Sequence, residues 1–245
     1  METSEDKQLF ENTPKAIAVR HVKLIDLLPQ FVASSLMYLP VIQAGINMSF
    51  ASVLISQLAD DDWKIDTNQA SIIGSIWAIS LPFGAFSSGY LSDRIGRRKI
   101  GIFVCIPFFM AWILTAISNS VMTIYLARIV AGICCGITTA SVVYTAEISY
   151  KTFRSALLCM NSVWVSFGIF STYLLNYLHL NWHLIAWIYA AVSFCSMLLI
   201  LLVPESSHWT LFFKQHVREE EKFAQLRKSL TWLYRDPEVI FNQFY

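Results

Sequence analysis

The segment GYLSDRIGRRK, residues 89–99, places Asp93 and four basic side chains between two apolar runs that are each long enough to cross a bilayer. Fixed charges are costly inside hydrocarbon, so this segment must lie at a membrane surface. Gly96 supplies the backbone freedom that a tight reversal needs. Asp93 can accept hydrogen bonds from backbone amides or from the neighbouring arginines. The segment therefore predicts a charged turn between two transmembrane helices.

The composition of the whole chain agrees with a membrane location. Of its 245 residues, 56% are hydrophobic and 14% are charged, whereas soluble domains carry about 25% charged residues. The net charge of +1 argues against a nucleic-acid surface, which needs a basic stripe. All five cysteines lie in apolar runs, and the chain carries no enzyme motif. We expect an integral membrane protein that is not an enzyme and uses no metal or cofactor.

Six apolar runs have the length of about 20 residues that a spanning helix requires. No polar face recurs through them at helical spacing, which argues against a soluble helical bundle. The predicted fold is an all-α membrane protein with a six-helix transmembrane bundle at 30–203, preceded by a segment at 1–29 and followed by a helical segment at 204–245. The predicted spans are Gln30–Ser52, Ala70–Leu91, Ile100–Ser118, Val121–Tyr144, Ala156–Leu178 and Trp182–Val203.

The distribution of charge between the spans predicts the orientation. Basic residues gather before span one, between spans two and three, and between spans four and five, while the other loops are acidic or uncharged. The positive-inside rule then places both termini in the cytoplasm. After span six, residues Gln215–Tyr234 carry apolar side chains at helical spacing, with acidic residues first and basic residues later. This pattern predicts an amphipathic cytoplasmic helix.

Small residues recur at a spacing of four on two of the spans. Ser80, Gly84 and Ser88 share one face of span two, and Gly132 and Gly136 share one face of span four. Small side chains let helix backbones approach closely in lipid, so these faces predict tight helix contacts.

Two more charged clusters are expected on the same side as residues 89–99. One runs from Glu147 to Arg154, and the other is PESSHW, residues 204–209. Ions at a membrane edge are costly unless they are paired. We expect Glu147 and Glu205 to pair with Arg97, Arg98 or Arg154, with separately solvated charges as the alternative.

Three motifs in this order are similar to those of a known family: GYLSDRIGRRK at 89–99, RIVAGICCGITTASVVYTAE at 128–147 and PESSHWT at 204–210. Together they resemble the sugar porter branch of the major facilitator superfamily, near its facilitated glucose and trehalose carriers. The resemblance runs from about Gln30 to the C-terminus and corresponds to the N-terminal half of that fold. It implies two six-helix bundles around a central sugar site, closed on the cytoplasmic side by salt bridges. The gate residues that it implies here are Asp93, Arg94, Arg97, Arg98, Glu147, Arg154 and Glu205.

The chain departs from the family pattern at two positions. His208 stands where the family motif has arginine, and Ser162 stands where many hexose carriers have a sugar-binding glutamine. Each polar residue within a span could contact the sugar, but a hydrogen bond to a neighbouring helix explains it equally well. The candidate substrate-lining residues are Gln43, Asn47, Arg128, Asn161 and Ser162.

The absence of an acid predicts the mode of transport. Proton symport needs a titratable group in the pathway, and span one has no carboxylate between Asp26 and Asp60. The leading interpretation is therefore facilitated diffusion of a sugar by alternating access, with this chain as the N-terminal half. Two alternatives stay open: a non-transporting half-carrier that associates with or regulates a full-length transporter, and an organic-ion carrier of the same superfamily. The expected partners are the sugar, membrane lipid and a C-terminal half or full-length carrier, in the plasma membrane.

Overall fold

The computed structural model describes residues 28–60, 63, 65–150, 153–212, 229 and 231–233. Within them, long helices follow one another with short connections. The helices are α2 (Leu28–Met37), α3 (Leu39–Asp60), α4 (Thr67–Ile95), α5 (Arg97–Ala116), α6 (Val121–Ile137), α7 (Thr139–Ile148), α8 (Arg154–Tyr177), α9 (Trp182–Ile200) and α10 (Ser207–Phe212).

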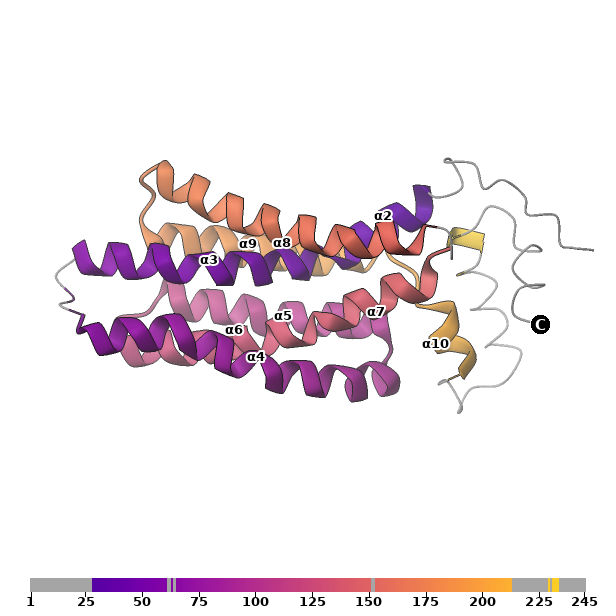
Figure 1. Cartoon of the computed structure of the whole chain (residues 1–245), viewed down its shortest axis with the longest axis horizontal. Helices are drawn as coiled ribbons and strands as arrows, with labels where there is room; N and C mark the ends of the chain where they lie inside the picture. The colour runs from indigo at the N-terminus through magenta and orange to yellow at the C-terminus, as the bar shows by residue number, and fades with distance from the viewer. Residues whose placement is uncertain are drawn as a thin grey trace, which may run out of the picture.

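The described part of the chain holds six helices long and apolar enough to cross a membrane, with α6 and α7 counted together as one. They run alongside one another in an elongated bundle, with α3, α8 and α9 in one layer and α4, α5 and α6 in the other (Figure 1). The most extensive contacts join α4 to α6, α5 to α9 and α3 to α8. The prediction of a six-helix transmembrane bundle is confirmed.

The first span differs from its predicted bounds of 30–52. A separate short helix, α2, precedes it, the chain turns at Tyr38, and the candidate span then runs along α3 from Leu39 to Ala59. Pro40 has no N–H group to donate to the carbonyl one turn earlier, which explains the interruption at this position. The span extends beyond Ser52 because its later polar side chain, Gln57, is fully hydrogen-bonded. The Gln57 Nε2 atom donates to Asn176 Oδ1 and to the Leu180 carbonyl, each at 3.0 Å.

Spans two and four are also longer than predicted. Span two continues through residues 92–95 and ends at Ile95, because the next residue, Gly96, leaves the helical conformation. Span four reaches Ile148 through α7, with a break at Thr138. The Thr138 hydroxyl donates to the Cys135 carbonyl at 2.7 Å, a local bond of the kind that bends helices. Residues 1–27 and most of 204–245, including most of the predicted helix at 215–234, lie outside the described residues.

Backbone contacts hold two of the helix pairs together. A Cβ atom at Gly84 would lie 1.9 Å from the Ile133 carbonyl oxygen, and one at Gly132 would lie 1.9 Å from Ser80 Oγ. Ser88 Oγ lies 2.6 Å from Thr139 Oγ1. The tight contact predicted for these faces of spans two and four is therefore confirmed. Two other glycines, at 45 and 168, bring α3 and α8 together in the same way.

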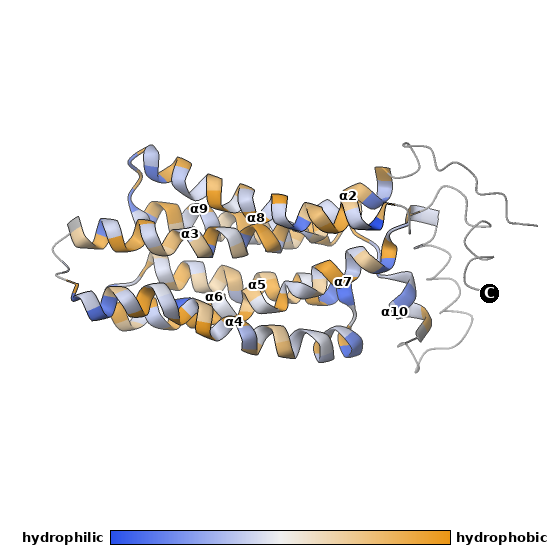
Figure 2. Ribbon diagram, in the orientation of Figure 1, coloured by the Kyte–Doolittle hydropathy of each residue, from blue (hydrophilic) through white to orange (hydrophobic). Residues whose placement is uncertain are grey.

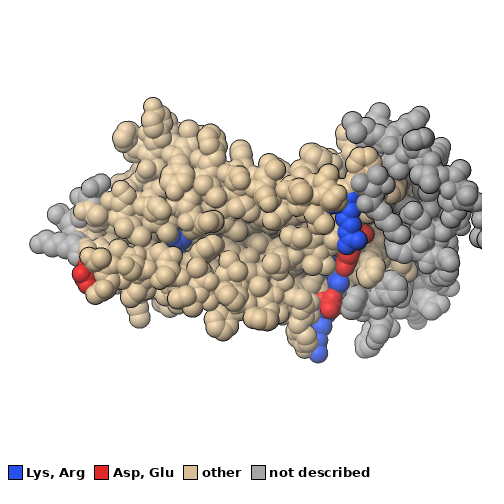
Figure 3. Space-filling model, in the orientation of Figure 1, with Lys and Arg blue, Asp and Glu red and all other residues tan. Residues whose placement is uncertain are grey.

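The outer surface of the bundle is apolar. Large side chains such as Phe83, Phe86 and Leu202 are exposed, and hydrophilic residues concentrate toward the helix ends (Figure 2). Charged side chains form a narrow stripe across one end of the bundle (Figure 3). This distribution is typical of a protein that faces lipid along its length and water at its ends.

Candidate functional site

The turn between α4 and α5 consists of the single residue Gly96. Its φ of 108° and ψ of 148° lie in a region that side chains with a Cβ rarely adopt. A Cβ atom here would also lie 2.8 Å from Glu205 Oε2. Glycine is therefore required for the backbone conformation, as the sequence predicted, and also for the approach of the 204–209 segment, which the sequence did not predict.

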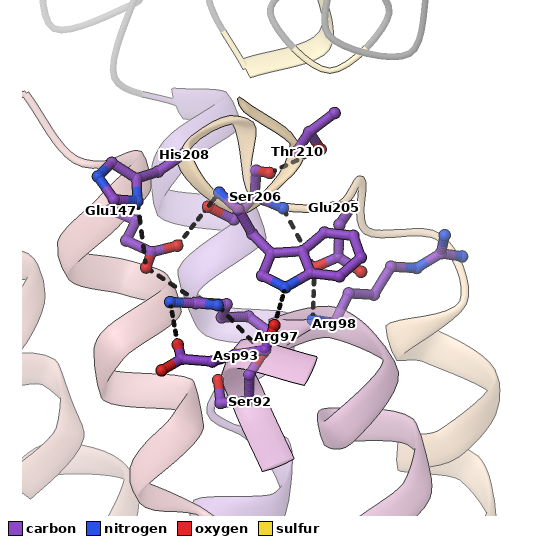
Figure 4. A network of polar contacts seen from close by, with 10 residues as sticks. Ser92, Asp93, Arg97, Arg98, Glu147, Glu205, Ser206, His208 and Thr210 are labelled. Carbon is purple, nitrogen blue, oxygen red and sulfur yellow. Dashed lines mark hydrogen bonds and ion pairs between the residues drawn. The ribbon is translucent and has the colours of Figure 1, made fainter. Parts of the chain in front are cut away.

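The reversal at Gly96 buries the side chain of Arg97 among oxygen atoms. Arg97 Nη2 lies 2.9 Å from Asp93 Oδ1, and Arg97 Nε lies 3.0 Å from Glu147 Oε1. Arg97 Nη1 donates to the Ser92 carbonyl at 3.0 Å. Since a buried guanidinium needs paired charges and satisfied donors, these bonds explain how a 4% exposed arginine is tolerated (Figure 4).

Glu147, near the end of α7, also contacts the segment that follows α9. Its Oε2 atom accepts a hydrogen bond from the Ser206 hydroxyl, and its Oε1 atom lies 3.8 Å from His208 Nδ1. Trp209 Nε1 donates to the Asp93 carbonyl at 2.8 Å. Residues from α4, α5, α7 and 204–209 thus meet at one point, which we call the polar cluster (Asp93, Arg97, Arg98, Glu147, Glu205 and Ser206).

Glu205 accepts hydrogen bonds at the start of α5. Its Oε1 atom accepts from the Arg98 backbone N–H at 2.8 Å and from the Ser206 N–H at 3.3 Å. Burial raises the pKa of the Glu205 carboxyl, and these hydrogen bonds and the nearby Arg98 and Lys99 charges oppose that rise. The carboxyl therefore satisfies an otherwise unpaired amide in the first turn of α5.

Two predicted gate residues stand apart from the polar cluster. Arg94 lies over the Tyr90 ring, with its Cζ atom 4.3 Å from the ring centroid. Arg154 is exposed at the first turn of α8. Neither forms an ion pair with a described residue, so the predicted pairing of Arg154 is not found. The contacts of Ser206 and Trp209 were missed, although both lie within the PESSHW motif that was singled out.

A second polar group lies inside the bundle, between α3, α5 and α6. Arg128 Nη1 donates to the Asn47 carbonyl at 2.9 Å, and Trp112 Nε1 donates to Gln43 Oε1 at 2.8 Å. Within the described part of the chain, Arg128 Nε, Arg128 Nη2 and Gln43 Nε2 are buried without a hydrogen-bond partner. Three of the predicted lining residues thus come together, and Trp112 joins them unpredicted.

The two candidates on α8 are placed differently. Asn161 is half-buried and Ser162 is exposed. No hydrogen bond joins either of them to Gln43, Asn47 or Arg128 in the described regions. The six-span pattern gave no signal for this difference, because α8 is apolar around most of its circumference.

Comparison with known proteins places the chain in a family. The sequence model described as "Sugar (and other) transporter" matches residues 34–240. The chain belongs to this family. Among its relatives, the facilitated trehalose transporter Tret1 of Apis mellifera ligustica is 26% identical over 208 residues, which are 83% of this chain and 40% of the relative. The glucose transporter GlcP of Staphylococcus epidermidis is 28% identical over 73% of this chain and 39% of its own length.

The fold of this sugar transporter family member agrees with solved structures. The xylose transporter XylE from E. coli, in a partially occluded inward-open conformation, superposes with a TM-score of 0.70 at 20% identity, over 88% of this chain and 59% of that one. This likeness establishes the major facilitator fold, of which the chain has the N-terminal half. The chain spans about 40% of the length of these two curated relatives and less of others, down to 17% for the facilitated trehalose transporter Tret1 of Drosophila virilis.

Proposed function

We propose that this chain forms the N-terminal six-helix half of a carrier that moves a sugar across the membrane by facilitated diffusion. The observation that carries the proposal is the set of unpaired donors on Gln43 and Arg128. Buried donors without partners are costly in a bundle surrounded by lipid. Sugar hydroxyls are acceptors as well as donors, so a bound sugar would satisfy these groups.

The burial of α4 and α8 supports a site that is completed by a second bundle. Only 17% of the most apolar 18-residue window of each helix is buried, against 67% for α3. Both helices therefore have wide faces available for another helical body. In this proposal, Gln43, Asn47 and Arg128 form one wall of the sugar site and the second bundle forms the opposite wall.

The polar cluster is proposed as the N-terminal part of a cytoplasmic gate. The positive-inside rule supports this side of the membrane, because Arg94, Arg97, Arg98 and Lys99 all lie at this end. The contacts of Glu147 with both Arg97 and Ser206 link the start of α5 and the end of α7 to the segment after α9. Opening of the cytoplasmic side would separate these groups. The same proposal places the protein in the plasma membrane, with both termini in the cytoplasm.

Facilitated diffusion is favoured over symport by the surroundings of Arg128. In the described residues, the contacts of its guanidinium are the Asn47 carbonyl and the Phe50 ring, whose centroid lies 5.8 Å from Cζ. Neither group titrates near neutral pH, so these two contacts of Arg128 offer no site for a coupled proton.

The same arginine favours a second candidate cargo, an organic anion. A guanidinium with two unpaired nitrogens can bind a carboxylate by two parallel hydrogen bonds. The two cargo classes differ in charge, so a matched pair of ligands that differ in one carboxylate separates them. Glucose and glucuronate are such a pair, since both are pyranose rings.

Ligand binding by the reconstituted chain tests the proposal. Tryptophan fluorescence should change saturably with glucose or trehalose, because Trp112 bonds to Gln43. The variant Gln43→Ala should raise the dissociation constant about tenfold, the effect of losing a hydrogen bond of roughly 1.4 kcal/mol. Ser49→Ala is the control, since this hydroxyl bonds only to carbonyls of its own helix. Saturation by glucuronate alone would move the assignment to the organic anion.

A flux measurement distinguishes a half-carrier from a complete one. Vesicles that contain this chain alone should show no saturable uptake of labelled glucose or trehalose, because one bundle provides one wall of the site. Robust saturable uptake by the monomeric chain would contradict the proposed need for a second bundle.

A further inference from the structure

A pocket of about 480 Å³ lies beside the polar cluster, at the end of α9. The N-terminus of α5 contributes Arg98 and Lys99 to its wall, and the segment after α9 contributes Leu201 and Leu202. Trp209 and Trp232 also line it. The pocket is separate from the interior group around Gln43 and Arg128.

The pocket carries an excess of positive charge. Arg98 and Lys99 line it, and Glu205 is the one acid among its lining residues. The carboxyl of Glu205 bonds to the backbone N–H of Arg98, and no salt bridge joins the Arg98 guanidinium to a described carboxylate. Arg98 Nη2 donates to the Leu201 carbonyl at 2.6 Å, and the buried Arg98 Nε has no partner within the described ranges.

Lys99 also forms no direct ion pair with a described residue, although its charge acts on the nearby Glu205 carboxyl. Its Nζ atom lies 6.0 Å from the centroid of the Trp209 ring, and no salt bridge joins it to a described acid. Trp209 is buried, whereas Trp232, which also lines the pocket, is exposed. A tryptophan and a lysine at the end of a span are typical of side chains that lie at the headgroup level of a membrane.

The other wall of the pocket is apolar and exposed. The exposed fraction is 48% for Leu201, 67% for Leu202 and 40% for Trp232. Leu201 and Leu202 directly follow α9, so they lie where a spanning helix leaves the hydrocarbon. A ligand that fits this pocket therefore needs an anionic group for the two cations and an apolar part for the leucines.

We propose that this pocket binds the headgroup of an anionic phospholipid, with its phosphate at Arg98 and Lys99 and its acyl chains along Leu201 and Leu202. The apolar wall favours a membrane lipid over free phosphate, which has no apolar part. The site does not depend on the identity of the transported cargo. A lipid bound here would contact Arg98 and Lys99 at the start of α5. The preceding residue, Arg97, belongs to the polar cluster, so the lipid composition of one leaflet would affect that cluster.

Native mass spectrometry of the full chain tests the proposal, with micelles that contain equal amounts of phosphatidylglycerol and phosphatidylcholine. The chain should retain phosphatidylglycerol preferentially. The variant Lys99→Gln should lower the bound fraction about fivefold, the effect of one basic residue near an anionic surface. Arg94→Gln is the matched control, because it removes the same charge from the same turn but lies over Tyr90, outside the pocket lining.

Each other outcome would overturn the proposal. Equal retention of the two lipids would exclude a site for an anionic headgroup. An equal loss in Lys99→Gln and Arg94→Gln would mean unspecific attraction to the surface. Competition by millimolar inorganic phosphate without any lipid preference would assign the pocket to a soluble anion. If Lys99→Gln does not yield folded protein, Leu202→Glu at an exposed position replaces it, and unchanged lipid retention in that variant would count equally against the site.

Discussion

The Nε atom of Arg97 lies 3.0 Å from Oε1 of Glu147, a residue 50 positions later in the chain. This ion pair joins the start of α5 to the end of α7, and both side chains are almost fully buried, at 5% and 11% exposure. Arg97 also pairs with Asp93, whose side chain is 49% exposed. The buried partner is therefore the more important one for the stability of the cluster.

Replacing Glu147 with alanine should destabilise the chain by about 3 kcal/mol, because it leaves the buried Arg97 charge with one half-exposed partner. The measurement is the thermal unfolding of the purified chain in detergent. Arg154→Ala provides the control, since this exposed residue has no ion pair among the described residues, and its effect should stay within about 0.5 kcal/mol. Equal effects of the two variants would mean that the Arg97–Glu147 pair contributes little.

Glu205 should make stability depend on pH. Burial raises the pKa of its carboxyl in the folded chain above the ordinary value of 4.5. The folded state therefore favours the protonated form. The resulting stabilisation is complete below the ordinary pKa and is lost as the pH rises through the higher folded-state pKa.

The comparison with Glu205→Gln isolates this effect. The glutamine keeps an oxygen that can accept from the Arg98 N–H and does not titrate. Between acidic and neutral pH, the melting temperature of the original chain should fall relative to that of the variant. A difference that stays constant with pH, or that changes in the opposite direction, would disprove the assignment.

Gly132→Ala should weaken the α4–α6 pair by about 1–3 kcal/mol, because the new methyl group would meet Ser80 Oγ and the Trp77 carbonyl oxygen, at 1.9 and 2.4 Å. Gly74→Ala on α4 is the matched control, since nothing lies within 4 Å of the added Cβ. This control should be neutral or stabilising by up to about 1 kcal/mol, from helix propensity. Unfolding of both variants in detergent measures the difference.

Gln57→Leu should destabilise the end of the bundle opposite the polar cluster. Gln57 Oε1 accepts from the Trp182 N–H at 2.6 Å, and its amide nitrogen donates to Asn176 and Leu180. Removing it leaves these groups without partners, at about 1–3 kcal/mol for each buried one. Hydrogen exchange should become faster at the start of α9 and stay unchanged at the start of α5. Faster exchange at both ends would indicate global loosening instead.

The sequence predicted the number of spans because length and hydrophobicity determine them almost directly. It also predicted the role of Gly96 and the glycine faces, since both depend on local geometry or a regular spacing. The pairing of Arg154 and the placement of Ser162 were harder, because both require the rotation of α8 about its axis. A helix that is apolar around its circumference carries little information on that rotation.

The interior group was predicted only in part, for a related reason. Gln43, Asn47 and Arg128 were noticed as polar residues in lipid, where every such residue needs a partner. Trp112 was missed because a tryptophan in an apolar span is unremarkable until its indole N–H is seen to donate to Gln43. The role of Trp112 becomes visible only in the structure, where α3 and α5 bring Gln43 and Trp112 together.

The backbone contacts at the glycines also affect how this sequence can change over generations. At Gly84 and Gly136, any side chain larger than a hydrogen atom would collide with the backbone of the facing helix. An outward position on α5 such as Phe103, at 50% exposure, accepts many apolar replacements without a collision. Neutral substitutions in this chain should therefore accumulate on the outer apolar surface. The glycines between paired helices should stay unchanged in descendants that keep the fold.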